Sequence, residues 1–284
     1  MKRILLVGRN GQVGHELQRT LAPLGEIIAV DRQALDLDRA DDIRSQLRTL
    51  RPEIIVNAAA YTAVDQAEAE PERAMAINAV APGVMAEEAK QLGALLVHYS
   101  TDYVFDGAKS GPYTEDDRPN PQNAYGRSKL AGEQAIQATG CRHLIFRTSW
   151  VYGRHGKNFL RTIQRLAALK AELTVVDDQI GAPTWSRMIA EATALAVRGD
   201  PRNDQHSGLY HLSSAGQTSW HGFAGAILAA QGWSGKLQPI PTKDYPLPAP
   251  RPANSVLNNH KLAAELGLAL PDWREALALC LADE

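Results

Sequence analysis

The chain has 284 residues, of which 44% are hydrophobic and 22% charged, and its formal net charge is −2. This length allows one large domain or two smaller ones, each with a full hydrophobic core. A slightly acidic chain argues against nucleic acid or an acidic membrane as the main partner, because both favour a basic surface.

The N-terminal segment does not match a targeting sequence. The apolar run from Ile4 to Val7 stops at a glycine, which is too short for the core of a signal peptide. No apolar run approaches the roughly 18 residues of a membrane helix. Cys141 and Cys280 lie far apart, without the spacing of a metal or redox site, which is typical of thiols in a reducing compartment. We therefore expect a cytoplasmic protein with no bound structural metal.

The first half of the chain alternates between apolar strands and helical segments. The predicted strands are 3–7, 27–30, 54–60, 94–100 and 143–150, and the predicted helices are 11–24, 41–50, 72–92 and 124–139. Strands that alternate with helices indicate right-handed βαβ units and a parallel sheet that is covered on both faces.

The second half is less regular. Helices are predicted at 159–170, 186–197, 220–231, 258–266 and 272–281, and strands at 173–176 and 209–213. Residues 239–252 hold six prolines and predict a loop. The predicted fold class is α/β, with a Rossmann-like doubly wound parallel sheet over 1–153 and a smaller, irregular substrate-binding domain over 154–284. Segments around 172–213 are candidates to return to the first domain.

A glycine-rich turn connects the first strand to the first helix. Such a turn lets a pyrophosphate approach the backbone, and the start of the helix supplies free N–H groups. The spacing is GxxGxxG rather than GxGxxG. The turn predicts a dinucleotide site that is formed by Gly8, Asn10, Gly11, Gln12, Val13 and Gly14.

The residues that follow the second strand leave the choice of cofactor open. Asp31 is placed to bond a ribose 2′-hydroxyl, which favours NADH, whereas Arg32 could neutralise a 2′-phosphate and admit NADPH. We therefore expect both cofactors to be usable. Ala59 and Ala60, after the third strand, are small enough for a cofactor to lie against the strand end.

A tyrosine, a lysine and a threonine have the chemistry of a ketone reductase. Tyr125 and Lys129 share one face of a predicted helix, and Thr101 ends a predicted strand. A free phenol has a pKa of about 10, and an ammonium at about 4 Å would lower it by about three units at an effective dielectric of 20. Tyr125 could then act as general acid on a ketone whose oxygen Thr101 orients.

These motifs together resemble the extended short-chain dehydrogenase/reductases. Longer strings resemble the dTDP-4-dehydrorhamnose reductase family within that group, over essentially the whole chain. The strings are RPEIIVNAAAYTAVDQAE, YSTDYVFDG, AYGRSKLAGE, RTSWVYG, DDQIGAPT and RPANSVL.

The resemblance implies a reaction and a set of site residues. NADPH or NADH would deliver hydride to C4 of dTDP-4-dehydro-6-deoxy-L-mannose and give dTDP-L-rhamnose, with Tyr125 as proton donor and Lys129 on the nicotinamide ribose. Further cofactor contacts would be Asp36, Leu37, Tyr61, Thr62 and Tyr99. The substrate would contact Thr101, Asp102, Tyr125, Trp150 and Arg251.

Alternative functions of the chain would require different residues or a different use of the cofactor. A nucleotide-sugar dehydratase needs a glutamate where this chain has Tyr103. A nucleotide-sugar epimerase would not consume added NADPH, and a non-catalytic subunit of the methionine adenosyltransferase type would not need the Tyr125, Lys129 and Thr101 set. The sequence leaves open whether the chain forms a homodimer and whether it uses Mg²⁺.

Overall fold

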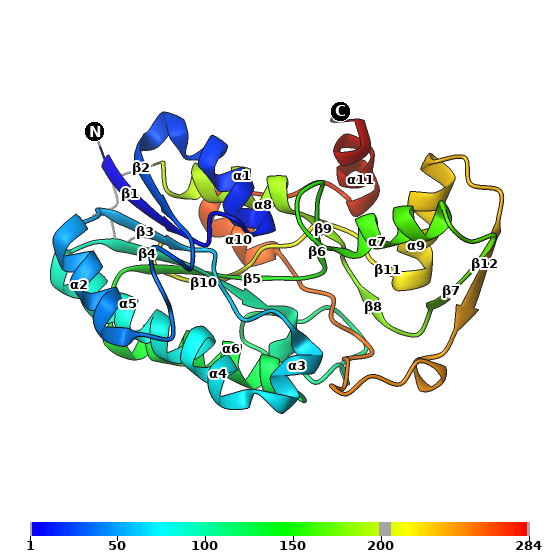
Figure 1. The fold of residues 1–284 in the computed structure, drawn as a ribbon, viewed down its shortest axis with the longest axis horizontal. Helices are drawn as coiled ribbons and strands as arrows, with labels where there is room; N and C mark the ends of the chain where they lie inside the picture. The colour runs from blue at the N-terminus through cyan, green and yellow to red at the C-terminus, as the bar shows by residue number, and fades with distance from the viewer. Residues whose placement is uncertain (1, 199–205, 283–284) are drawn as a thin grey trace.

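A parallel six-stranded sheet forms the centre of the larger part of the molecule, which is described here by a computed structural model (Figure 1). The structure describes residues 2–198 and 206–282, so residue 1 of the first predicted domain and 199–205 and 283–284 of the second lie outside the described residues. The strands run in the order β10-β5-β4-β3-β1-β2. Their bounds are β1 (Lys2–Val7), β2 (Gly25–Val30), β3 (Ile54–Asn57), β4 (Leu95–Thr101), β5 (His143–Thr148) and β10 (Gly208–His211).

Helices cover both faces of this sheet, because successive strand residues point to opposite faces. Ile4 and Leu6 pack in a cluster with α1 (Gln12–Thr20), α8 (Ser186–Ala196) and α10 (His260–Leu266). Leu5 and Val7 pack in another with α2 (Ala40–Leu50), α5 (Ala81–Leu92) and α6 (Ala124–Thr139). The predicted Rossmann-like doubly wound sheet is therefore confirmed.

The predicted helix 72–92 is wrong in one respect, because it is not a single regular α-helix. It consists of α4 (Pro71–Met75), a π-helical turn over Ala76–Val80, and α5. Asn78 in the π turn bonds the backbone N–H and carbonyl of Tyr61 at 2.8 and 3.0 Å and the Ser128 hydroxyl at 2.9 Å. Such turns often occur at functional sites. The short helix α3 (Val64–Ala69) was not predicted.

The remaining elements form a smaller part with its own core around Tyr152, Phe223 and Trp273. It contains β6 (Val151–Tyr152), α7 (Phe159–Ala167), β7 (Glu172–Val176), β8 (Ile180–Gly181), β9 (Thr184–Trp185), β11 (Thr218–Ser219), α9 (Trp220–Ala230), β12 (Lys236–Ile240) and α11 (Trp273–Ala282). The loop predicted from residue 239 begins slightly later, because β12 pairs with β7 as far as Ile240. Pro239 is tolerated there because β12 is an edge strand.

Three segments from the second half of the chain, β10, α8 and α10, belong to the larger part of the molecule. The strand β10 extends the sheet beside β5, and α8 lies against α1, where the Thr20 hydroxyl donates to the Ala190 carbonyl at 3.1 Å. The boundary at residue 153 stays a prediction. Within 2–198 and 206–282, no helix has the length and apolar character needed to cross a membrane.

A buried ion pair ties α6 to β5 below the site. Arg147 donates from Nε and Nη2 to the two carboxylate oxygens of Glu133 at 2.9 and 2.7 Å, and both side chains are at most 3% exposed. The Ser100 hydroxyl on β4 donates to the same carboxylate. The pair therefore holds α6 against two strands of the sheet.

Removal of one partner from this pair should be costly, because it leaves the other charge buried and unpaired. We expect Arg147→Met to lower the free energy of unfolding by about 3–5 kcal/mol. In Arg39→Met, which breaks the exposed pair with Asp42, the change should stay within about 0.5 kcal/mol. Urea denaturation measures both, and a loss below about 1 kcal/mol in Arg147→Met would contradict the assignment.

Candidate functional site

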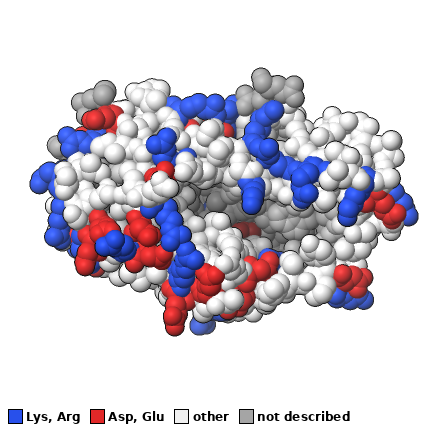
Figure 2. All heavy atoms as spheres, viewed as in Figure 1, with Lys and Arg blue, Asp and Glu red and all other residues white. Residues whose placement is uncertain are grey.

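A cleft of about 720 Å³ opens at the carboxyl ends of β1, β3 and β4. Ligands bind at this edge of a doubly wound sheet, where neighbouring connections leave in opposite directions, and β1 lies between β2 and β3. Figure 2 shows the surface hollowed between the two parts, with Lys and Arg side chains gathered along its upper rim. The cleft is therefore the candidate site.

The glycine turn forms one wall of the cleft. Gly8 has φ +89°, and a Cβ on it would lie 2.6 Å from the amide nitrogen of Ala59, so a side chain there would push the turn away from the end of β3. Gly11 caps α1 without a side-chain hydrogen bond. The first N–H groups of α1 are therefore directed toward the cleft without a capping side chain, which is the arrangement that favours an anion.

Every predicted cofactor contact but one lines this cleft. They are Gly8, Asn10, Gly11, Gln12, Val13, Asp31, Arg32, Asp36, Leu37, Ala59, Ala60, Tyr61, Thr62, Tyr99, Tyr125 and Lys129. Gly14 does not line it. A Cβ on Gly14 would lie 2.1 Å from the carbonyl oxygen of Gly8, so this glycine lets α1 pack against the turn.

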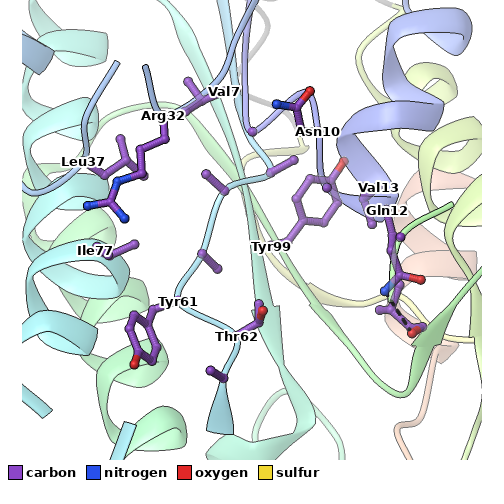
Figure 3. A pocket seen from close by; sticks show the side chains of 18 of the residues that line it. Val7, Asn10, Gln12, Val13, Arg32, Leu37, Tyr61, Thr62, Ile77 and Tyr99 are labelled. Atoms are coloured by element: carbon purple, nitrogen blue, oxygen red, sulfur yellow. Dashed lines mark hydrogen bonds between the residues drawn. The ribbon is translucent and has the colours of Figure 1, made fainter. Parts of the chain in front are cut away.

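One end of the cleft is rich in paired charges. Figure 3 shows Arg32 beside Leu37 and Ile77 on one side of the cleft, with Asn10 and Tyr99 on the other. Arg32 lies 3.1 Å from Asp38, and Arg73 on α4 lies 3.8 Å from the same carboxylate. Asp31 accepts from the backbone N–H of Gln33 at 3.0 Å. This end could bind an adenosine ribose with or without a 2′-phosphate.

Tyr125 lies in the first turn of α6 at the other end of the cleft. Asn123 caps that helix by accepting from the Gly126 N–H at 2.7 Å, which fixes the helix start. Burial raises the pKa of Tyr125 to about 12, and the Thr101 hydroxyl opposes that rise. The expected lowering of this pKa by Lys129 is therefore wrong for this state, and burial decides the direction.

Lys129 also lines the cleft, but its amine contacts a different group. Its Nζ lies 3.1 Å from Nε2 of His98, a fully buried residue of β4. Burial lowers the pKa of Lys129 to about 8, and the Glu133 carboxylate opposes that shift.

Thr101 and Asp102 stand together where β4 ends, buried beside the cleft. The Thr101 hydroxyl donates to Asp102 Oδ1 at 3.0 Å, and Oδ2 has no hydrogen-bond partner among the described residues. Burial raises the pKa of Asp102 to about 7, against the hydrogen bond from Thr101. An orphaned buried oxygen there could bond a polar ligand such as a sugar.

Trp150 adopts a backbone conformation that is unusual for its residue type, with φ +47°. Its ring stacks on Trp220 at the start of α9, with centroids 3.6 Å apart and planes 5° from parallel. Strained residues of this kind cluster at functional sites. Trp150 lies outside the cleft lining, next to the smaller part of the molecule.

Arg251 does not present a free guanidinium. Its two terminal nitrogens donate to the two oxygens of Asp65 on α3 at 2.8 and 2.9 Å, and its side chain is 13% exposed. A phosphate could bind this fork only if the Asp65 pair opened. The pair instead fastens the proline-rich segment to the first part of the chain.

Several lining residues were not predicted from the sequence. Arg73 and Ile77 carry no local motif, and Lys157 belongs to a loop that crosses from the other part. The Asn158 amide in that loop donates to Gln12 at 2.9 Å, which places it over the glycine turn. The unpredicted residues include Arg73, Ile77, Thr148, Val151, Gly156 and Lys157.

Comparisons with known proteins agree on one family. The family described as "RmlD substrate binding domain" matches residues 1–284. A dTDP-4-dehydrorhamnose reductase of Burkholderia thailandensis is 50% identical, with 99% of this chain and 98% of the relative covered. One of Escherichia coli K12 is 47% identical, with 95% and 94% covered. A crystal structure of dTDP-4-dehydrorhamnose reductase from Bacillus anthracis in complex with NADP has a TM-score of 0.95 and 36% identity, covering 100% and 99% of the chains.

The Asp65–Arg251 pair should contribute to stability through its bidentate geometry. Across Asp65→Ala, Arg251→Ala and the double variant, we expect a coupling free energy of about 1–2 kcal/mol from urea denaturation at pH 7. The pKa of Asp65 is lowered mainly by the hydrogen bond from Arg251, so the coupling is lost as the pH falls through that lowered value. The exposed Asp272–Arg274 pair is the control, and equal coupling in both pairs would contradict this account.

Proposed function

The chain belongs to the RmlD family of dTDP-4-dehydrorhamnose reductases, and from this membership we propose how its residues carry out the reaction of that family. The enzyme is an NAD(P)H-dependent oxidoreductase. It reduces the C4 ketone of dTDP-4-dehydro-6-deoxy-L-mannose to dTDP-L-rhamnose, the last step of dTDP-L-rhamnose synthesis. The observation that carries the assignment of residues is the meeting of Tyr125 and Lys129 with the glycine turn in one cleft.

The residues of the cleft fit a dinucleotide. The backbone at Gly8 is too close to Ala59 for any side chain to fit between them. The first N–H groups of α1 have no capping side chain, which suits a pyrophosphate. Asp31 and Arg32 would hold the adenosine ribose, while Ala60 and Tyr61 would lie along the bound molecule. The bound cofactor supplies the hydride.

Tyr125 supplies the proton. As the carbonyl oxygen at C4 gains negative charge, the phenol of Tyr125 transfers its proton to that oxygen. The hydroxyl of Thr101 would hold the same oxygen in line, and an ammonium on Lys129 would stabilise the phenolate that remains. Because burial raises the pKa of Tyr125, the phenol keeps its proton until the substrate takes it.

Substrate recognition would use groups outside the cofactor wall. We propose that Asp102 bonds a sugar hydroxyl through its unpartnered oxygen and that Trp150 packs on the sugar side, supported by its strained backbone and its stack on Trp220. Arg251 would reach the diphosphate after exchanging Asp65 for a phosphate oxygen.

A cytoplasmic location is also proposed, because Cys141 and Cys280 lie far apart in the sequence and are both buried, as is typical of thiols in a reducing compartment. A homodimer is a further proposal, and sedimentation equilibrium would test it. Sedimentation equilibrium with and without a chelator would test whether Mg²⁺ is needed for that homodimer.

Arg32 should set the preference between the two cofactors. We expect Arg32→Ala to weaken NADPH binding about 10-fold, because the 2′-phosphate loses a charged partner, while NADH binding changes less than about twofold. Fluorescence titration gives both dissociation constants. Arg39→Ala, whose side chain pairs with Asp42 and does not line the cleft, is the control. Equal weakening of both cofactors would remove Arg32 from the 2′-phosphate site.

Tyr125→Phe tests the proton donor. Turnover of the keto-sugar should fall by about 10²-fold or more, because no general acid remains at the ketone, while the dissociation constant of NADPH stays near the wild-type value. Tyr245→Phe, at an exposed position, should keep wild-type turnover. A Tyr125→Phe enzyme with near wild-type turnover would show that another group donates the proton.

A further inference from the structure

A buried chain of polar groups connects the end of β3 to Lys129. Asn57 and His98 are paired residues of the neighbouring strands β3 and β4. The Asn57 amide nitrogen lies 3.2 Å from His98 Nδ1, and His98 Nε2 lies 3.1 Å from Lys129 Nζ. All three side chains are at most 1% exposed, so water does not compete for these contacts.

The backbone fixes the direction of this chain. The N–H of Ala59 donates to Asn57 Oδ1 at 3.2 Å, and a backbone N–H can only donate. The amide nitrogen of Asn57, which also only donates, must therefore face His98 Nδ1. A neutral imidazole with an accepting Nδ1 carries its proton on Nε2. Burial holds the pKa of His98 well below its usual range, so the ring is neutral.

The partner of that Nε2–H must accept a hydrogen bond. An ammonium has no acceptor, whereas a neutral amine has one lone pair. We propose that His98 is a positioning residue that, at alkaline pH, donates Nε2–H to Lys129 and holds it as the neutral amine in the free enzyme, and that Lys129 then takes up a proton from solvent when the dinucleotide binds. The second half of this proposal rests on the proposed cofactor function.

The groups around Lys129 favour the uptake of a proton by its amine when the dinucleotide binds. On α6, Tyr125 is an uncharged phenol, and the charge of Glu133 is already paired with Arg147 of β5. On β4, His98 is neutral. A dinucleotide adds a negatively charged pyrophosphate to the cleft and ribose hydroxyls that accept from an ammonium. The long lysine stem can turn from His98 toward those hydroxyls.

The pH at which proton uptake appears follows from the pKa of Lys129 in the free enzyme and in the dinucleotide complex. Burial lowers the pKa of Lys129 to about 8 in the free enzyme, and the bound anion raises it again. Between the two values the free enzyme lacks the proton and the complex carries it. Uptake should therefore be small at pH 7 and approach one proton near pH 9.

Calorimetry measures the uptake directly. Wild-type enzyme is titrated with NADH, which lacks the titrating 2′-phosphate, in two buffers of different ionisation enthalpy at pH 7 and pH 9. We expect about 0.5–1 proton per NADH at pH 9 and less than about 0.3 at pH 7. Zero uptake at pH 9 would overturn the proposal.

A matched pair of variants identifies the group that takes up the proton. Lys129→Met should abolish the uptake, whereas Lys157→Met, which changes another lysine of the cleft lining, should retain it. Retained uptake in Lys129→Met would overturn the proposal. Thermal melts of both variants show whether they fold.

The tautomer of His98 is measured on the unmodified protein. The nitrogen-15 NMR signals of His98 are identified as those that disappear in His98→Gln. In the free enzyme at pH 8.5 they should show a protonated Nε2 and an unprotonated Nδ1. The opposite tautomer would overturn the proposal even if calorimetry showed uptake. Neither experiment uses the sugar substrate, so the two proposals can fail separately. An enzyme that reduces the ketone but takes up no proton on binding NADH contradicts only this inference. Proton uptake without ketone reduction contradicts only the proposed function.

Discussion

The close approach of the glycine turn to the end of β3 is the constraint on which the site depends. At Gly8 the backbone comes so near to Ala59 that even a methyl group would collide with it. This contact closes one wall of the cleft and leaves the start of α1 open. The N–H of Ala59 also orients Asn57, and through it His98 and Lys129. One short segment therefore shapes one wall of the cleft and orders Lys129.

Burial explains the resting protonation of the ionisable groups at the candidate site. It raises the pKa values of Tyr125 and Asp102 and lowers that of Lys129, so each shift favours the uncharged form. An isolated charge would be costly there, whereas the deeper Glu133–Arg147 charges are paired with good geometry. The charges of these groups can thus develop when a bound ligand supplies partners for them.

The sheet, the glycine turn and the tyrosine–lysine face could be predicted because each has a local pattern: strand–helix alternation, glycine spacing and an i, i+4 pair. The missed features depend on contacts between distant residues. Arg251 was expected at a phosphate, but its partner Asp65 is 186 residues away. His98 lies in an apolar strand and resembles a core residue, and nothing near Trp150 indicates that Trp220 stacks on it. The π turn that holds Asn78 also has no signal in the apolar pattern of 72–92.

The transfer of hydride to the sugar tests the central claim most directly. The enzyme is incubated with NADPH deuterated at C4 of the nicotinamide and with dTDP-4-dehydro-6-deoxy-glucose, together with a 3,5-epimerase that forms the L-sugar in place. This account predicts dTDP-L-rhamnose with deuterium at C4 of the sugar, formed only when the epimerase is present. A folded, NADPH-binding enzyme that leaves the keto-sugar unreduced, or a product with deuterium at another carbon, would contradict it.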